Sequence, residues 1–268
     1  MGTANKQSHT KNIIWGKMAS PGQLCEVVAG LLGKSLPTVL AYDHQLAKAG
    51  LRTTGGRGRS AARMTATDAA TLIIASIVSP TIKDTVEAFK SYSSLRPVFS
   101  SLHIKHNKEV VTKVPLGNAW DLRFMPVPRL KSLEDNHTFH NFLAAILEAV
   151  TTGEIKLAEH FSQEIRVRFS PYPPSIIVPE VSITLTVPWV FARVVISTEN
   201  FDEIKSYGAS ATASYVGQGA TDMSADYKIT DRTLFAVGKC LRDEPLGKIP
   251  SRKVRESMRA AISKAQER

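Results

Sequence analysis

Two closely spaced helix starts constrain the N-terminal fold more than any other feature of this sequence. Ser20 and Ser35 are typical N-cap residues, and a proline follows each of them inside the first helical turn. Apolar residues recur at helical spacing after each start, and Gly33 separates the two runs. We expect the second helix to end near Gly50 and to bury Leu36, Val39, Leu40, Leu46 and Ala47. The sequence therefore predicts two short helices joined by a tight turn.

A glycine-rich segment that carries arginines follows the second helix. Two short stretches, Leu51–Thr54 and Ala61–Thr65, flank the segment Gly55–Ser60, and this pattern predicts a β-hairpin. No acidic residue occurs between Asp43 and Asp68. Two helices followed by a basic hairpin are the elements of a winged helix-turn-helix. In that fold the second helix enters the major groove of DNA, and basic hairpin residues reach phosphates or the minor groove.

The residues "SLPTVLAYDHQLAKAGLRTTGGRGRSAARMT" resemble the recognition helix and wing of bacterial winged helix-turn-helix transcription regulators. The ending "LAKAGL" and the Gly/Arg segment after it carry most of this resemblance, which covers about residues 20–65. It implies sequence-specific binding of double-stranded DNA, commonly as a homodimer, and a cytoplasmic location on the nucleoid. The long polar lead, residues 1–19, departs from the pattern, and we interpret it as an N-terminal arm.

Ten polar side chains of the predicted recognition helix and wing are candidate DNA contacts. They are Ser35, Thr38, Tyr42, His44, Gln45, Lys48, Arg52, Arg57, Arg59 and Arg63. Each has a structural alternative: Tyr42 would equally well seal the core between the helices, and His44 and Gln45 would suit a solvated face. For the segment as a whole, the alternative is an ordinary part of a globular core or a protein-binding winged helix.

The charge distribution supports an interaction with a polyanion. The chain has a formal net charge of +10, and residues 1–65 alone hold nine basic and two acidic residues, a net +7. Residues 239–268 hold nine basic and four acidic residues, a net +5, whereas the middle of the chain is close to neutral. Positive surfaces attract nucleic acid. The C-terminal basic helix is either a second DNA contact or a solvated helix.

The rest of the chain predicts two connecting helices in residues 66–95, broken at Ser79-Pro80, and an α+β domain with an antiparallel sheet in residues 96–268. We expect this domain to assemble the oligomer or to sense an effector. Its predicted strands are Val98–Lys105, Glu109–Val114, Ala119–Pro126, Ile165–Phe169, Val181–Ser197 (interrupted at Pro188), and a hairpin of Ala209–Val216 with Ser224–Ile229. Its predicted helices are His140–Gln163, Thr230–Leu241 and Ser251–Gln266.

Signals for enzyme chemistry are weak. His137 and His140 are spaced to share one helical face, but the HExxH arrangement, the Walker lysine motif and the nucleophile elbow are absent. Cys25 and Cys240 have no metal-type spacing, and no apolar run is long enough to span a bilayer. We therefore expect a transcription regulator that is not an enzyme and needs no cofactor or metal. The alternatives are a nucleoid-associated, partition or replication-type DNA-binding protein and, less favoured, a metal-dependent nucleic-acid enzyme using His137 and His140.

Overall fold

The computed structural model describes residues 19–55, 62–106, 109–117, 128–155, 180–197, 201–208 and 224–244. Its helices are α1 (Pro21–Leu32), α2 (Leu36–Lys48), α3 (Ala66–Val78), α4 (Thr85–Ser93), α5 (Pro128–Lys131), α6 (Phe139–Thr152) and α7 (Asp231–Leu241). Its strands are β1 (Arg96–His106), β2 (Glu109–Gly117), β3 (Glu180–Val187), β4 (Phe191–Ser197), β5 (Phe201–Gly208) and β6 (Ala225–Thr230). The predicted α+β class is confirmed. None of these helices is long and apolar enough to cross a membrane.

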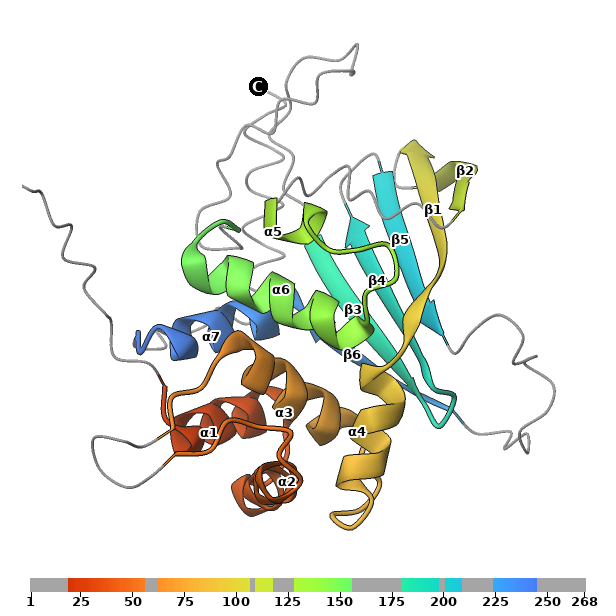
Figure 1. The fold of residues 1–268 in the computed structure, drawn as a ribbon. Helices are drawn as coiled ribbons and strands as arrows, with labels where there is room; N and C mark the ends of the chain where they lie inside the picture. Colours follow the sequence, from red (N-terminus) through yellow and green to blue (C-terminus); the bar gives the residue numbers. More distant parts are fainter. Residues whose placement is uncertain are drawn as a thin grey trace, which may run out of the picture.

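The six strands form one antiparallel sheet in the order β2-β1-β5-β4-β3-β6. The described helices gather on one of its faces (Figure 1). Strand β3 shows why: Val181, Ile183 and Leu185 are buried, and the intervening residues are only half-buried. Because successive side chains of a strand point to opposite faces, this alternation gives the sheet one buried, apolar face and one more open face.

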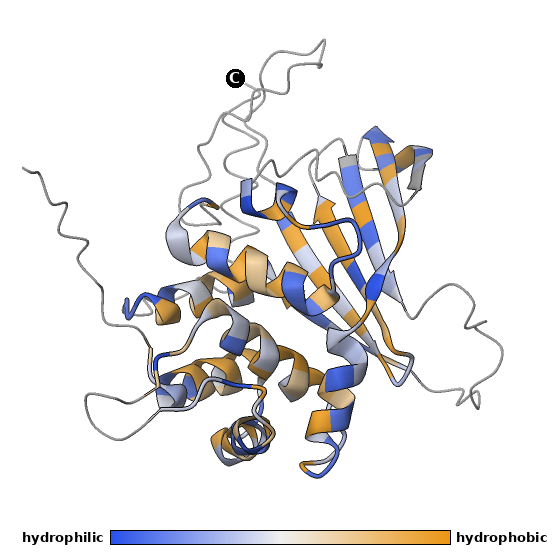
Figure 2. Ribbon diagram, viewed as in Figure 1, coloured by the Kyte–Doolittle hydropathy of each residue, from blue (hydrophilic) through white to orange (hydrophobic). Residues whose placement is uncertain are grey.

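Helix α3 lies at the centre of the helical layer. All of its residues except Thr67 are buried, and it contacts α1, α2, α4, α6, α7 and β3. Figure 2 shows hydrophobic residues along α3 and along the helices around it. A single cluster of buried apolar residues runs from Leu24 in α1 to Leu241 in α7. The domain boundary that we expected between residues 65 and 66 therefore crosses a continuous core and not a linker.

Most helix predictions agree with the structure, including the break at Ser79-Pro80, and the first part of the predicted helix His140–Gln163 is α6, which ends at Thr152. The interruption predicted at Pro188 is confirmed, because Val181–Ser197 is a hairpin of two strands with its turn at residues 188–190. One strand was missed: residues 201–208, which were assigned to no element, form β5, one of the two central strands of the sheet.

Several predicted elements lie outside the described residues. These are the arm before residue 19, the strands Ala119–Pro126, Ile165–Phe169 and Ala209–Val216, and the last helix, Ser251–Gln266. The predicted partner of Ala209–Val216, Ser224–Ile229, is largely β6, and it pairs with β3. Arg57 and Arg59 also lie outside the described residues. The predicted hairpin strands Leu51–Thr54 and Ala61–Thr65 were wrong over their described part, because residues 51–55 and 62–65 contain no strand.

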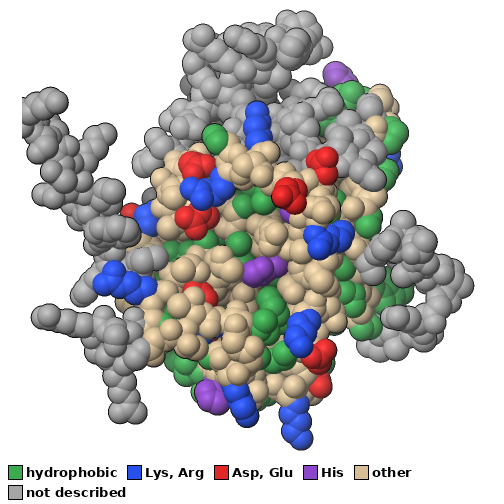
Figure 3. All heavy atoms as spheres, in the orientation of Figure 1, with side chains coloured by type: hydrophobic (Ala, Val, Ile, Leu, Met, Phe, Trp, Pro, Cys, Tyr) green, Lys and Arg blue, Asp and Glu red, His purple; other side chains and the backbone are tan. Residues whose placement is uncertain are grey.

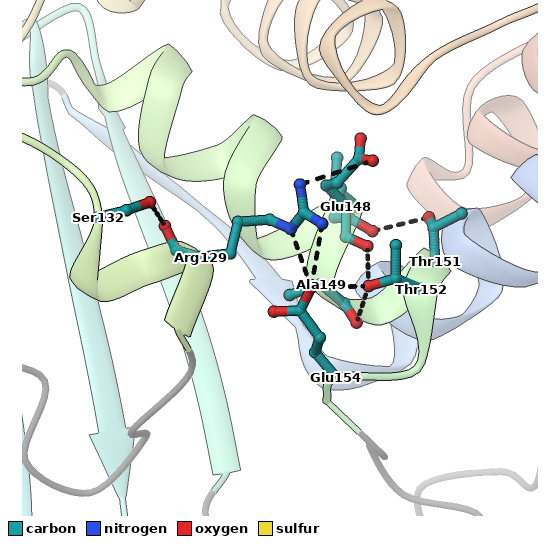
Figure 4. A network of polar contacts seen from close by, with 8 residues as sticks. Arg129, Ser132, Glu148, Ala149, Thr151, Thr152 and Glu154 are labelled. Atoms are coloured by element: carbon teal, nitrogen blue, oxygen red, sulfur yellow. Dashed lines mark hydrogen bonds and ion pairs between the residues drawn. The ribbon is translucent and has the colours of Figure 1, made fainter.

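A polar network fastens α5 to the C-terminal end of α6. The Arg129 guanidinium lies 3.0 Å from Glu154 and 3.7 Å from Glu148, and the Thr152 hydroxyl donates to Glu154 over 3.2 Å (Figure 4). The pairs are partly exposed, so each contributes only a fraction of a kcal/mol to stability. We interpret this network as a fastening of the short helix α5, not as a chemical site.

Two helical glycines, one in the close contact of α7 with α6 and one on the surface of α1, should respond in opposite ways to substitution by alanine. A Cβ added at Gly238 would lie 2.5 Å from a Val150 methyl carbon, whereas nothing lies within 4 Å of one added at Gly30 in α1. We expect Gly238→Ala to lower the free energy of unfolding by about 1–3 kcal/mol. Gly30→Ala should raise it by about 0.5–1 kcal/mol. Chemical denaturation measures both, and Gly238→Ala combined with Val150→Ala should recover part of the loss; an unchanged stability of Gly238→Ala would contradict the close approach.

Candidate nucleic-acid interface

Helices α1 and α2 form a helix-turn-helix with a three-residue turn, Gly33 to Ser35. Gly33 ends α1 in the left-handed conformation, at φ 66°, which a residue with a side chain adopts only with strain. Ser35 starts α2: its hydroxyl accepts the Thr38 amide over 3.3 Å and lies 2.6 Å from the Thr38 hydroxyl. Figure 1 shows α2 running across the direction of α1. Such a crossing pair with a glycine-containing turn is the common geometry of DNA-binding helix-turn-helix motifs.

Helix α2 is rotated relative to the sequence prediction. The residues that it buries are Val39, Tyr42, Asp43 and Leu46, spaced as one face of a helix. Leu40, which we expected inside, is 42% exposed. Tyr42, a candidate DNA contact, is buried: its hydroxyl donates to the Ser79 carbonyl over 3.4 Å. The structure therefore supports the packing alternative for Tyr42.

A buried ion pair holds the chain where it leaves α2. Arg52 Nη2 lies 2.7 Å from Asp43 Oδ2, and the two side chains are only 11% and 8% exposed. Arg52 Nη1 also donates to the Thr53 carbonyl over 2.5 Å. Burial raises the pKa of Asp43, although the hydrogen bond and the charge of Arg52 oppose the rise. Arg52, predicted as a wing contact, is therefore turned into the protein and serves the fold.

The Asp68 carboxylate joins the two ends of the Gly/Arg segment. It accepts the amide of Thr53, before the segment, over 2.7 Å, and the amide and hydroxyl of Thr65, after it, over 2.9 and 2.8 Å. The Met64 amide then donates to the Ala19 carbonyl over 3.0 Å, next to the start of α1. These bonds fix the base of the predicted wing against the N-terminus of α3 and beside α1.

The outward side of α2 keeps most of the other candidate contacts. His44 and Lys48 are exposed, Gln45 is half-buried, and Arg63 is exposed beyond the Gly/Arg segment. In Figure 3, histidine and basic side chains project from the lower edge of the molecule, where Figure 1 places α2 and the turn before α4. Leu40 lies on the same side, but it is not among the candidate contacts predicted from the sequence, because a leucine in a helix is normally assigned to the core. Leu40 and His44 are four residues apart and so share one face of the helix, which is the signal that would have placed Leu40 outside.

The histidines do not form the metal site considered above. His137 Nε2 lies 2.9 Å from the Tyr207 hydroxyl, and its Nδ1 lies 2.5 Å from the Glu134 carbonyl. His140 Nε2 instead lies 2.9 Å from the Thr71 hydroxyl. In the described part of the chain, no group of three or more His, Cys, Asp or Glu side chains is placed to hold a metal ion. The two rings belong to different hydrogen-bond networks.

A shallow hollow lies between α3, α4 and α6. Its volume is about 330 Å³, and its lining is mostly apolar, with hydroxyl groups and one imidazole at its edge: Leu51, Thr71, Phe89, Ser93, Ser94, Thr138 and His140. The His140 ring meets Phe89 edge-on, with 5.5 Å between centroids. Burial lowers the pKa of His140, so its ring is neutral at pH 7. A neutral ring beside hydroxyl groups suits hydrogen bonding and offers no fixed charge to an ionic ligand.

Strand β5 carries a second buried ion pair, far from α2 in the sheet. Lys205 Nζ lies 3.3 Å from Glu203 Oε1 and 2.6 Å from Ser100 Oγ, and both charged side chains are 0–1% exposed. A serine beside a lysine can act as a nucleophile only when the lysine is neutral. Here Glu203 favours the charged lysine, so we interpret the cluster as structural.

Comparison with protein-family models, curated proteins and solved structures found no match.

We predict that Arg52→Ala destabilises the fold. Removing one partner of a buried ion pair leaves the other charge unpaired, so the free energy of unfolding should fall by about 3–5 kcal/mol. The double variant Asp43→Leu with Arg52→Met removes both charges and should lose clearly less. Urea denaturation measures all three proteins. A stability of Arg52→Ala equal to that of the parent protein would show that Arg52 is not tied to Asp43 in solution.

We also predict that stability falls as the pH drops below about 6.5. Burial lowers the pKa of His137 and of His140, so the unfolded chain takes up protons at a higher pH than the folded one. The stabilising effect of the neutral rings is complete above the unfolded pKa and is lost as the pH falls toward the folded values. Unfolding at pH 7.5 and 5.5 tests this, and His140→Gln should reduce the difference. NMR titration of His140 with a pKa above 6.5 would refute the prediction.

Proposed function

We propose that the protein binds double-stranded DNA through α2 and acts as a transcription regulator. The observation that carries the proposal is the α1–α2 helix-turn-helix, whose second helix presents His44, Gln45 and Lys48 away from the core. Imidazole, amide and ammonium groups are suited to base edges and phosphates. The exposed Leu40 offers an apolar contact for a thymine methyl group.

The base of the Gly/Arg segment supports a second DNA contact beside α2. Thr53 and Thr65, on either side of the segment, are both bonded to Asp68, and Met64 is bonded to the residue before the first helix. The segment between them carries Arg57 and Arg59 in the sequence, and the exposed Arg63 follows. Arginines in a segment whose two ends are fixed beside α2 are suited to the phosphates or the minor groove beside the major-groove site.

The proposal narrows the list of DNA contacts. Tyr42 and Arg52 are excluded because both are buried in contacts with the core, and Ser35 and Thr38 cap α2. The proposed set is Leu40, His44, Gln45, Lys48, Arg57, Arg59 and Arg63. Since the described residues of one chain hold one α1–α2 pair, regulation at a palindromic site through α2 would need a homodimer.

Lys48→Ala should weaken binding to duplex DNA and flatten its salt dependence. Each phosphate contact contributes a slope of about −0.9 to log K against log salt concentration, so the variant should lose about one unit of slope. Fluorescence anisotropy with a labelled random-sequence duplex measures this. Lys131→Ala, which removes an exposed lysine of α5, is the matched control and should leave the slope unchanged.

Sequence preference separates regulation from an architectural role. Selection from a random duplex pool should yield a recurring site, and His44→Ala should lower the preference for it over random DNA by about 1–3 kcal/mol. Equal affinity for unrelated duplexes would favour the nucleoid-associated alternative. If the parent protein fails to bind duplex DNA at low salt, or if Lys48→Ala and Arg57→Ala with Arg59→Ala bind as well as it does, the proposal is wrong.

A further inference from the structure

The two edges of the sheet differ in how they meet solvent. Strand β2, at one edge, carries Pro115 and has two register shifts against β1. Bulges and prolines are features that prevent an edge strand from pairing with another chain. Strand β6, at the other edge, pairs with β3 in an unbroken register from Ser182–Thr230 to Val187–Ala225 and contains no proline. The described part of β6 is thus a regular edge strand.

The side chains of β6 are self-complementary. Residues 225–228 are all exposed, and Tyr227 is exposed by 43%. If a second copy pairs antiparallel with β6 about a two-fold axis at Tyr227, then Asp226 of each copy faces Lys228 of the other. Opposite charges at facing positions stabilise an antiparallel pair, and facing aromatic rings do so as well. The Asp226 carboxylate is held in place by the Thr186 hydroxyl, 2.7 Å away.

We propose that β6 is the dimer interface of this protein, pairing edge to edge with β6 of a second copy. In this register Tyr227 faces its own copy on the axis, and Asp226 faces Lys228. The two sheets join into one, and because the axis is perpendicular to the sheet, both sets of helices lie on the same side. An isologous contact of this kind closes after two copies, as a regulator that binds paired half-sites requires.

A charge exchange within one strand tests the register. The full-length protein should sediment as a dimer that dissociates on dilution. Asp226→Lys alone and Lys228→Asp alone place like charges opposite each other twice per dimer, so each should raise the dimer dissociation constant about tenfold or more. The double variant restores opposite charges across the axis and should return the dissociation constant close to that of the parent. Lys113→Asp, at the other edge of the sheet, is the matched control and should leave it unchanged.

Cross-linking gives a second measurement that does not depend on the charged variants folding well. Tyr227→Cys brings two thiols together on the axis, and mild oxidation should give a disulfide-linked dimer that reducing agent separates. The parent protein, whose Cys25 and Cys240 are buried, is the control. A monomer at every concentration, a dissociation constant insensitive to both single substitutions, or a dimer broken by Lys113→Asp would each overturn the proposal. No DNA is present in either experiment, so the outcome does not depend on the proposed function.

Discussion

The fold depends on the burial of α3. Twelve of its thirteen residues are buried, so packing against a neighbour on one side alone cannot bury the whole helix. It therefore needs neighbours all round, and α1, α2, α4, α6, α7 and β3 supply them. Helices α1 and α2, which form the helix-turn-helix, are two of these neighbours. The second helix, α2, is held in place by the same core that holds the sheet, and the free energy that orders α2 comes from packing far more than from the helix itself.

Buried charge explains where sequence-based prediction of the candidate site failed. The start, turn and cap of α2 could be predicted, because Ser35, Pro37 and Gly33 act locally. Its rotation could not, because nothing in the sequence marks the charged residue Asp43 as buried. Asp43 is buried because Arg52 pairs with it, and with Asp43 included the buried residues of α2 lie at positions 39, 42, 43 and 46, the regular spacing of one helical face. Tyr42 then moves inward and Leu40 outward, so one ion pair decides which side chains of α2 face solvent.

Buried charge also explains why β5, one of the two central strands of the sheet, was not predicted from the sequence. A strand is recognised by apolar residues at every second position, as in β3, which was found. In β5 the inward positions hold Glu203, Lys205 and Tyr207, so charged residues occupy the places where apolar ones are expected. The buried Lys205 also depends on a residue that is close only in the folded chain: Ser100, which lies 2.6 Å from it, comes 105 residues earlier. The spacing of residues along the sequence does not show that a buried charge will be satisfied by such a distant partner.

The Asp68 carboxylate connects the central helix α3 to the segment that carries two of the four predicted DNA-binding arginines. It caps α3 through Thr65 and accepts the amide of Thr53, so the N-terminus of α3 and both ends of the Gly/Arg segment share one group. A negative charge is favourable at this end of a helix, which strengthens the arrangement. Helix α2 and both ends of the Gly/Arg segment are therefore fixed to the same core as the sheet. In a dimer joined through β6, the separation of the two recognition helices would be set by the packing of α3 against α2 and β3, without an intervening linker. Half-site spacing would then be a property of the core.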